Sequence, residues 1–251
     1  YALGLNCVAK TEFLAGLLRD RHGVGANVIR PGIDRTVFYP GEQHEFLGRP
    51  RLAALFRSNT SRRGASELIE ILRALRTRVP ELEVSLFGDD DGLPEDLSGW
   101  VKLTGKLTQE QVAELYRNSD LVLDPSYWHG FGRMGIEGMA CGAVPVLSRS
   151  GGIDRYARDA ENSLLFSSEN WQEAVEKIAH LSSDSSYRLD LRQAALKTAS
   201  EFSEIRATLD WISVLGLEQP KQSYVLLLEE LLSPSSKNVM VGDFKNIASA
   251  R

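Results

Sequence analysis

The chain has 251 residues, of which 43% are hydrophobic and 25% charged, so it can bury one complete α/β core and part of a second. A formal charge of −5, with basic residues spread along the chain, argues against nucleic acid as the main partner. The cysteines Cys7 and Cys141 lie far apart and outside any Cys-x-x-Cys pair, which argues against a disulfide framework or structural zinc and fits a reducing cytoplasm. No apolar run approaches the roughly 20 residues needed to span a bilayer. The first residue is Tyr1 rather than Met, from which we expect a fragment of a longer protein.

Apolar runs of strand length alternate with longer helical patterns, which predicts βαβ units and a parallel sheet. The helix predicted over 11–23 has Thr11 as its candidate N-cap and Gly23 as its stop, and Thr108 and Gln111 have capping-box spacing. The predicted fold class is therefore α/β, a Rossmann-like parallel sheet with helices on both faces, followed by C-terminal helices. The predicted strands are 5–9, 26–34 with its turn, 50–58, 82–88, 100–107, 120–126 and 143–149, and the predicted helices are 11–23, 65–79, 108–119, 134–142, 170–181 and those within 185–215.

A Pro- and Gly-rich stretch at 30–42 separates the first strand and helix from the rest, so we expect a domain boundary there. We assign no function to the tail, for which we expect a short helix and then a disordered end. The predicted parts are 1–30, the end of one α/β domain; 31–44, a linker; 45–180, a complete α/β domain; 181–217, C-terminal helices; and 218–251, the tail.

The ligand crevice of an open α/β sheet lies beyond the carboxyl ends of its strands, so the loops there are the ones to inspect. The first of these loops offers Arg57, Arg62 and Arg63 at a helix start, which suits a phosphate, although a solvated basic turn explains them equally well. The next contains Asp89 and Asp91, an Asp-x-Asp pair that could bind a divalent metal. A solvated acidic turn is the favoured interpretation of that pair.

Two further loops contain closely spaced glycines. In "SYWHGFGRMGIEGMACGAVPV" (126–146), Gly130 and Gly132 let the backbone approach a ligand closely, and the helix that follows offers free N–H groups to a diphosphate. Glu137, just inside that helix, could accept two hydrogen bonds from a ribose diol. The loop "SRSGGID" adds Gly151 and Gly152, for which a tight turn is the simplest explanation.

These residues form a known pattern. His129 and Glu137 are separated by seven residues, and "HGFGRMGIEGMACGAVPVLSRSGGI" resembles the Glu-x7-Glu segment of retaining glycosyltransferases of the GT-B fold, particularly the family GT4. "VIRPGIDRTVFYP" resembles the interdomain passage of that family, and "LTGKLTQEQVAELYRNSDLVLDPS" resembles its Gly-containing strand, capped helix and Pro-Ser turn. The resemblance covers residues 1 to about 180, with four motifs in the family's order.

The resemblance implies roles for several side chains. Glu137 matches the glutamate that holds the ribose hydroxyls of the nucleotide, and His129 matches the acidic position that touches the donor sugar. An imidazole cannot accept two hydroxyl bonds as a carboxylate does, which leaves the identity of the sugar open. Arg57 matches the arginine that binds the diphosphate, and Arg63 replaces the family's lysine. Because the loop is one residue longer than the common form, Arg62 could substitute for Arg63.

Main-chain groups are implied in donor binding as well. The stretch after Gly130, which comprises Phe131, Gly132, Arg133 and Met134, matches the one whose backbone amides face the sugar and the phosphate. Lys106 and Leu107 fall where the family's main chain meets the base. Arg155 replaces an acid that usually follows the Gly-Gly pair, a departure without a clear consequence in the sequence.

The implied reaction is transfer of a sugar from a nucleoside diphosphate to an acceptor hydroxyl with retention at the anomeric carbon. Arg57 and Arg63 would stabilise the leaving diphosphate in place of a metal ion, so we expect no cofactor and no metal dependence. The family's acceptor pocket belongs to the N-terminal domain, of which 1–30 would be the end. We therefore expect a donor-binding part that binds nucleotide sugar but does not transfer it alone.

The acceptor stays open among a glycan, a lipid-linked compound and a protein. We expect a cytoplasmic location, with contact at the inner face of a membrane if the acceptor is membrane-bound. The basic helix face with Arg73, Arg76 and Arg78 could then meet anionic lipid, but three charges are too few to predict it.

Three alternatives remain at the level of sequence. A nucleotide-sugar epimerase of related architecture could share the donor pocket and would need no acceptor. A non-catalytic domain of a larger protein would account for the departures at His129 and Arg155. A nicotinamide dehydrogenase is disfavoured because no Gly-x-Gly-x-x-Gly follows the first strand of the main domain. Trp128 at the mouth of the expected site could shape the sugar or acceptor pocket.

Overall fold

The structure is a computed structural model that describes residues 3–41 and 49–231. Residues 42–48, which include the end of the predicted linker and the start of the predicted main domain, lie outside the described residues. The same holds for residues 232–251, which make up most of the predicted tail.

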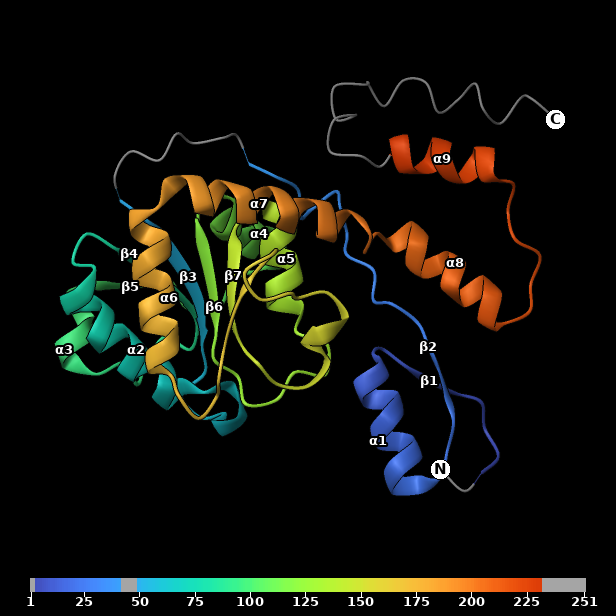
Figure 1. Ribbon diagram of the computed structural model, residues 1–251, viewed down its shortest axis with the longest axis horizontal. Helices are drawn as coiled ribbons and strands as arrows, with labels where there is room; N and C mark the ends of the chain where they lie inside the picture. Colours follow the sequence, from blue (N-terminus) through green and yellow to red (C-terminus); the bar gives the residue numbers. More distant parts are fainter. Residues whose placement is uncertain (1–2, 42–48, 232–251) are drawn as a thin grey trace.

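Six parallel strands form the main sheet in the order β5-β4-β3-β6-β7-β8 (Figure 1). The chain enters at the centre of the sheet, runs outward through β4 to β5, and then returns to the other side of β3 to form β6. The strand order therefore reverses between β3 and β6, which is where open sheets of this type bind ligands. The strands are β3 Arg51–Phe56, β4 Glu83–Gly88, β5 Val101–Leu103, β6 Leu121–Asp124, β7 Val144–Ser148 and β8 Leu164–Phe166.

Helices cover both faces of this sheet, as predicted (Figure 1). Alternate residues of β3 enter two different apolar clusters, Leu52 and Phe56 on one face and Ala53 on the other. The first face is covered by α2 Ala65–Arg78 and α6 Gln172–Ser183, and the second by α4 Gln109–Arg117 and α5 Arg133–Cys141. Helix α7 Ser185–Ser200 contributes to both clusters. The described part also contains α3 Glu95–Ser98 and the 3-10 turns η1 Ser61–Arg63 and η2 Gly151–Arg155.

A small two-stranded parallel sheet lies apart from the main one, with β1 Cys7–Ala9 paired to β2 Ala26–Val28. The helix between these strands, α1 Glu12–His22, begins and ends where the sequence predicts. The Thr11 hydroxyl accepts a hydrogen bond from Leu14 N, and Gly23 ends the helix at φ 64°. In Figure 1 this unit lies at the lower right, beside the loops that precede α5.

The segment after β2, which contains part of the predicted linker, packs against the main domain. Ile33 and Phe38 are each 1% exposed and belong to the apolar cluster of α4 and α5. The chain ends, within its described part, with α8 Glu204–Val214 and α9 Gln222–Leu231. The domain boundaries given above stay a prediction.

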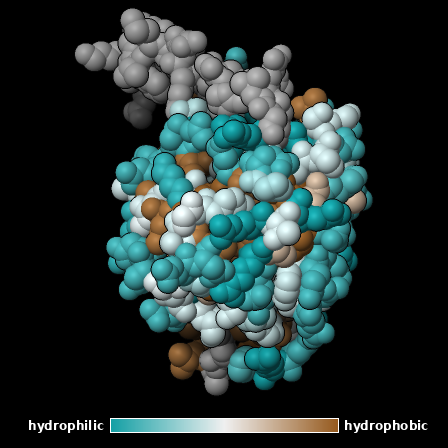
Figure 2. Space-filling model, turned by 90° about the vertical axis from the view of Figure 1, so that its left-hand side faces the viewer, coloured by the Kyte–Doolittle hydropathy of each residue, from teal (hydrophilic) through white to brown (hydrophobic). Residues whose placement is uncertain are grey.

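The face formed by α2, α3 and α6 is mostly hydrophilic, with apolar areas broken up by polar side chains (Figure 2). Its arginines have acidic partners: Arg73 donates to Asp96 at 2.8 Å, and Arg78 lies 3.6 Å from Glu176. These pairs offset the positive charge on which a contact with anionic lipid would depend. Within the described ranges, no helix is long and apolar enough to cross a membrane.

Candidate functional site

A cavity of about 830 Å³ lies between α1 and the start of α5, within the size range of small-molecule sites. One wall comes from β1 and α1 and includes Lys10, Leu14 and Arg21. The other wall comes from the loops after β3 and β6, at the reversal point of the sheet. From the predicted site it contains Arg62, Arg63, Glu137, Trp128 and all six residues from His129 to Met134, but not Arg57, Lys106 or Leu107.

The start of α5 provides a potential anion site in this cavity. Gly132 is its N-cap at φ 81°, and no side chain in the described part of the chain caps the helix. Gly135 N donates to Gly132 O at 3.2 Å, so the N–H groups of Arg133 and Met134 are the ones available to a ligand. A Cβ at Gly132 would lie 2.7 Å from Ile153 Cγ2 and 2.8 Å from Tyr156 Oη. The Tyr156 hydroxyl also donates to Gly132 O at 2.6 Å, so the helix start is fixed from behind. Only glycine combines this φ with this packing.

Glu137 lies in the cavity wall on the same helix and is 9% exposed. Burial raises the pKa of its carboxyl, and Arg133, one turn earlier, partly offsets that effect. Arg133 Nε donates to Glu137 Oε1 at 2.8 Å. One carboxylate oxygen is therefore bonded to Arg133, in a wall that is largely shielded from solvent. This arrangement suits the carboxylate to accept hydrogen bonds from neutral hydroxyls.

The ring of His129 is almost completely buried. Its side chain is 1% exposed, with Nε2 at 3.1 Å from Ser148 Oγ and Nδ1 at 3.7 Å from Asp124 Oδ2. Because Ser148 Oγ donates its one proton to Ser126 O, Nε2 must be the donor to Ser148. Burial lowers the pKa of the imidazole, Asp124 opposes this effect and Arg63 adds to it. His129 is among the residues that line the cavity, and its predicted contact with the sugar stays a prediction.

Two of the arginines that line the cavity, Arg62 and Arg63, are positioned by a close approach of two loops. Gly64 precedes α2 at φ 66°, and a Cβ there would lie 2.2 Å from Pro125 O in the loop after β6. Tyr127 N donates to Arg62 O at 2.9 Å. These contacts bring Arg62 and Arg63 to the same cavity as the start of α5.

Arg57 is half exposed and lies 3.4 Å from Asp89. The other oxygen of Asp89 accepts from Ser58 N at 2.9 Å and Ser58 Oγ at 3.2 Å. The prediction of a solvated turn is therefore wrong for Asp89, whose carboxylate fixes the loop after β3, whereas Asp91 is exposed as expected. Within residues 3–41 and 49–231, no group of three or more His, Cys, Asp or Glu side chains is arranged to hold a metal ion.

The structure adds residues that the sequence does not predict for the site, at the start of α1 and behind the loop before α5. The sequence predicts Thr11 only as an N-cap, yet its hydroxyl also donates to Gly130 O at 3.1 Å. Tyr156 and Ser148 stabilise the loop before α5 on the side away from the cavity, through hydrogen bonds to Gly132 O and Ser126 O. A signal existed for Thr11, because a Thr or Ser after a strand end also faces the ligand edge of a parallel sheet.

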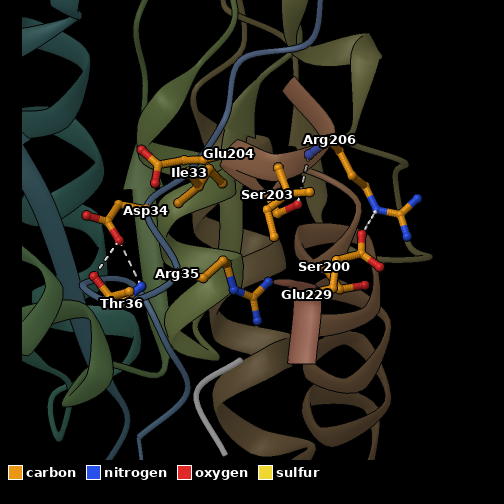
Figure 3. Close-up of a pocket in the computed structure, with 10 residues that line it drawn as sticks. Ile33, Asp34, Arg35, Thr36, Ser200, Ser203, Glu204, Arg206 and Glu229 are labelled. Atoms are coloured by element: carbon orange, nitrogen blue, oxygen red, sulfur yellow. Dashed lines mark hydrogen bonds and ion pairs between the residues drawn. The ribbon is translucent and has the colours of Figure 1, made fainter. Parts of the chain in front are cut away.

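A second cavity, of about 260 Å³, lies between the segment after β2 and helices α8 and α9 (Figure 3). It contains Arg35, whose buried Nε has no hydrogen-bond partner in the described part of the chain, and Arg206, which pairs with Glu229 at 3.0 Å. Asp34 and Glu204 also line it. Three carboxylates against two guanidiniums make it a poor site for a diphosphate, and none of its lining residues belongs to the predicted site.

The sequence profile of the family "Glycosyl transferases group 1" matches residues 42–198. The chain belongs to this family. The resemblance to GT4-like glycosyltransferases noted in the sequence is thus confirmed.

Curated relatives carry the name D-inositol 3-phosphate glycosyltransferase. The one from Nocardiopsis dassonvillei is 29% identical over 230 residues, which cover 81% of this chain and 52% of the relative. The one from Arthrobacter sp. is 29% identical over 194 residues, which cover 70% of this chain and 46% of the relative. This glycosyltransferase chain therefore spans about half the length of the relatives that it matches.

Solved structures with the same fold are GT-B glycosyltransferases, which confirms the predicted fold class. HepE of Anabaena in complex with UDP and glucose has a TM-score of 0.72 at 21% identity, covering 84% of this chain and 63% of that one. TarM of S. aureus has a TM-score of 0.73 at 18% identity, covering 83% of this chain and 43% of that one. The C-terminal domain of a group 1 glycosyltransferase (LpcC) from Francisella tularensis has a TM-score of 0.57 at 21% identity, covering 75% of this chain and 100% of that one.

Proposed function

We propose that this glycosyltransferase chain is the donor-binding part of a retaining enzyme that moves a sugar from a nucleoside-diphosphate sugar to an acceptor hydroxyl without a metal ion. The observation that carries the proposal is the cavity at the sheet's reversal point, which combines Arg62 and Arg63 with the start of α5 and the carboxylate of Glu137. The described complex of HepE with UDP and glucose is consistent with a nucleotide-sugar donor.

In this proposal the diphosphate lies at the start of α5. The free N–H groups after Gly132 donate to its oxygens, and Arg62 and Arg63 approach it from the loop after β3. As the bond to the sugar breaks, negative charge grows on the leaving diphosphate. Fixed cationic groups then bind it more tightly than in the ground state, which lowers the barrier. This arrangement supplies positive charge without a metal ion.

Glu137 accepts hydrogen bonds from the ribose hydroxyls in the proposed complex, because its second oxygen is not held by Arg133. We assign His129 a supporting role, in which its buried ring holds the backbone of the loop against the cavity. Lys106 and Leu107, outside this cavity, are proposed to meet the base at the same edge of the sheet, since they follow β5 as Arg57 follows β3. Transfer to an acceptor is expected to require parts beyond this chain.

Calorimetric titration with UDP, GDP, dTDP and ADP, each with and without EDTA, tests the proposal. We expect one nucleotide to bind with micromolar affinity and the affinity to survive EDTA. Loss of binding with EDTA would contradict the metal-free assignment, and failure of all four nucleotides to bind would favour a non-catalytic domain.

A further inference from the structure

Three consecutive residues in the first turn of α1 contact three different points of the site loops. The Thr11 hydroxyl donates to Gly130 O at 3.1 Å. Glu12 forms an ion pair with Arg155 of η2. The Phe13 ring lies 6.3 Å from the Trp128 ring, measured between centroids. Residues 11–13 thus join the small sheet to the loop after β6, which lines the cavity, and to η2, which packs against that loop.

The loop before α5 and the turn η2 pack so closely against Thr11 that no side chain fits at Gly152. Gly152 N donates to His129 O at 2.7 Å, and a Cβ at Gly152 would lie 2.8 Å from Thr11 Cγ2 and 2.3 Å from Gly130 O. Thr11 is 1% exposed although the helix it begins has no buried residue of its own. The first turn is therefore the part of α1 that is packed against the main domain, and a displacement of α1 would be transmitted to the loop that ends at Gly132.

Arg155 gains a role from this geometry. Its partner Glu12 supplies the opposite charge from α1. We propose that residues 11–13 position the loop 128–132 for the donor, with the Glu12–Arg155 pair as the charged element of that contact; the consequence for ligand binding rests on the function proposed above. Glu12 and Arg155 are positioning residues in this account.

A charge-reversal cycle tests this inference with Glu12→Arg, Arg155→Glu and the double variant in the whole chain. Asp20→Arg, at the exposed far end of the same helix, is the matched control. Hydrogen–deuterium exchange of residues 127–134 without ligand is the first readout. We expect residues 127–134 to exchange about two- to fivefold faster in each single variant, as for loss of a surface ion pair. In the double variant, which restores opposite charges, the exchange rate should return to that of the wild type. The control should exchange at the wild-type rate.

Affinity for the nucleoside-diphosphate sugar that the wild type binds is the second readout, and we expect it to follow the same pattern. Unchanged exchange in both single variants, or a double variant as fast as the two effects combined, would overturn the inference. If the wild type binds no nucleotide, the proposed function fails, while the exchange cycle still decides whether residues 11–13 hold the loop.

Discussion

Glu137 is the residue through which the proposed site is most directly tested. Replacing it by Gln keeps its volume but removes the charge that makes the second oxygen a strong acceptor. We expect Glu137→Gln to weaken nucleoside-diphosphate binding by about 1–3 kcal/mol. Glu176→Gln, whose side chain is 70% exposed on α6, should bind as the wild type does. Equal affinities of all three proteins in calorimetry would remove Glu137 from the site.

Substitutions of single arginines distinguish two possible diphosphate sites, one that uses Arg62 and Arg63 and one that uses Arg57. Arg62 and Arg63 line the cavity, whereas Arg57 is not among its lining residues and lies 3.4 Å from Asp89. We expect Arg63→Gln to weaken nucleoside-diphosphate binding by about 1.5–3 kcal/mol, as for a hydrogen bond to a charged group, and to leave nucleoside binding unchanged. A larger loss in Arg57→Gln than in Arg63→Gln would favour the assignment based on the family motif alone.

His129 is expected to make the stability of the chain depend on pH. Its pKa in the fold is lowered from 6.5, so the unfolded chain takes up a proton at a higher pH than the folded one. The free energy of unfolding should therefore fall as the pH drops below about 6.5, down to the folded pKa, and should be level above that window. In His129→Phe this slope should be absent. Denaturation curves at several pH values measure it, and identical slopes in both proteins would contradict the buried neutral ring.

At the scale of elements, the start of α5 depends on backbone geometry as much as on side chains. In Gly132→Ala the new Cβ meets Ile153 and Tyr156 at a φ of 81°. We expect a loss of about 1–3 kcal/mol in the free energy of unfolding, together with weaker nucleotide binding. Gly99→Ala, at φ −84° with nothing within 4 Å, is the matched control and should change stability by less than about 0.5 kcal/mol. Equal denaturation midpoints for the two variants would refute the strain.

Sequence patterns predicted the elements of the sheet up to β7 because each apolar run is bounded by Gly, Pro or a capping residue. The capping box of Thr108 and Gln111 is present as predicted. Strand β8 was missed, since its three residues follow a polar turn and give too short a pattern. The burial of Ile33 and Phe38 in the predicted linker could not be predicted, because they are single apolar residues without a periodic pattern.

Contacts across the sequence explain what could not be predicted in the site. Thr11 and Gly130 are 119 residues apart, and no local spacing indicates that they meet. The burial of His129 likewise depends on Ser148 and Asp124 from two neighbouring strands. Motif spacing predicts which residues share a cavity edge, whereas the direction of a ring depends on packing.

At the scale of the whole molecule, two α/β units meet along one cavity, with the cationic loops of the main sheet on one side and α1 on the other. The central claim is that this cavity binds the nucleotide part of a sugar donor. A crystal structure of the chain with the best-binding nucleoside diphosphate tests it most directly. We predict density for the diphosphate at the start of α5 and for the ribose at Glu137. Density only in the second cavity, between the segment after β2 and helices α8 and α9, or at any other place away from α5, would contradict the account.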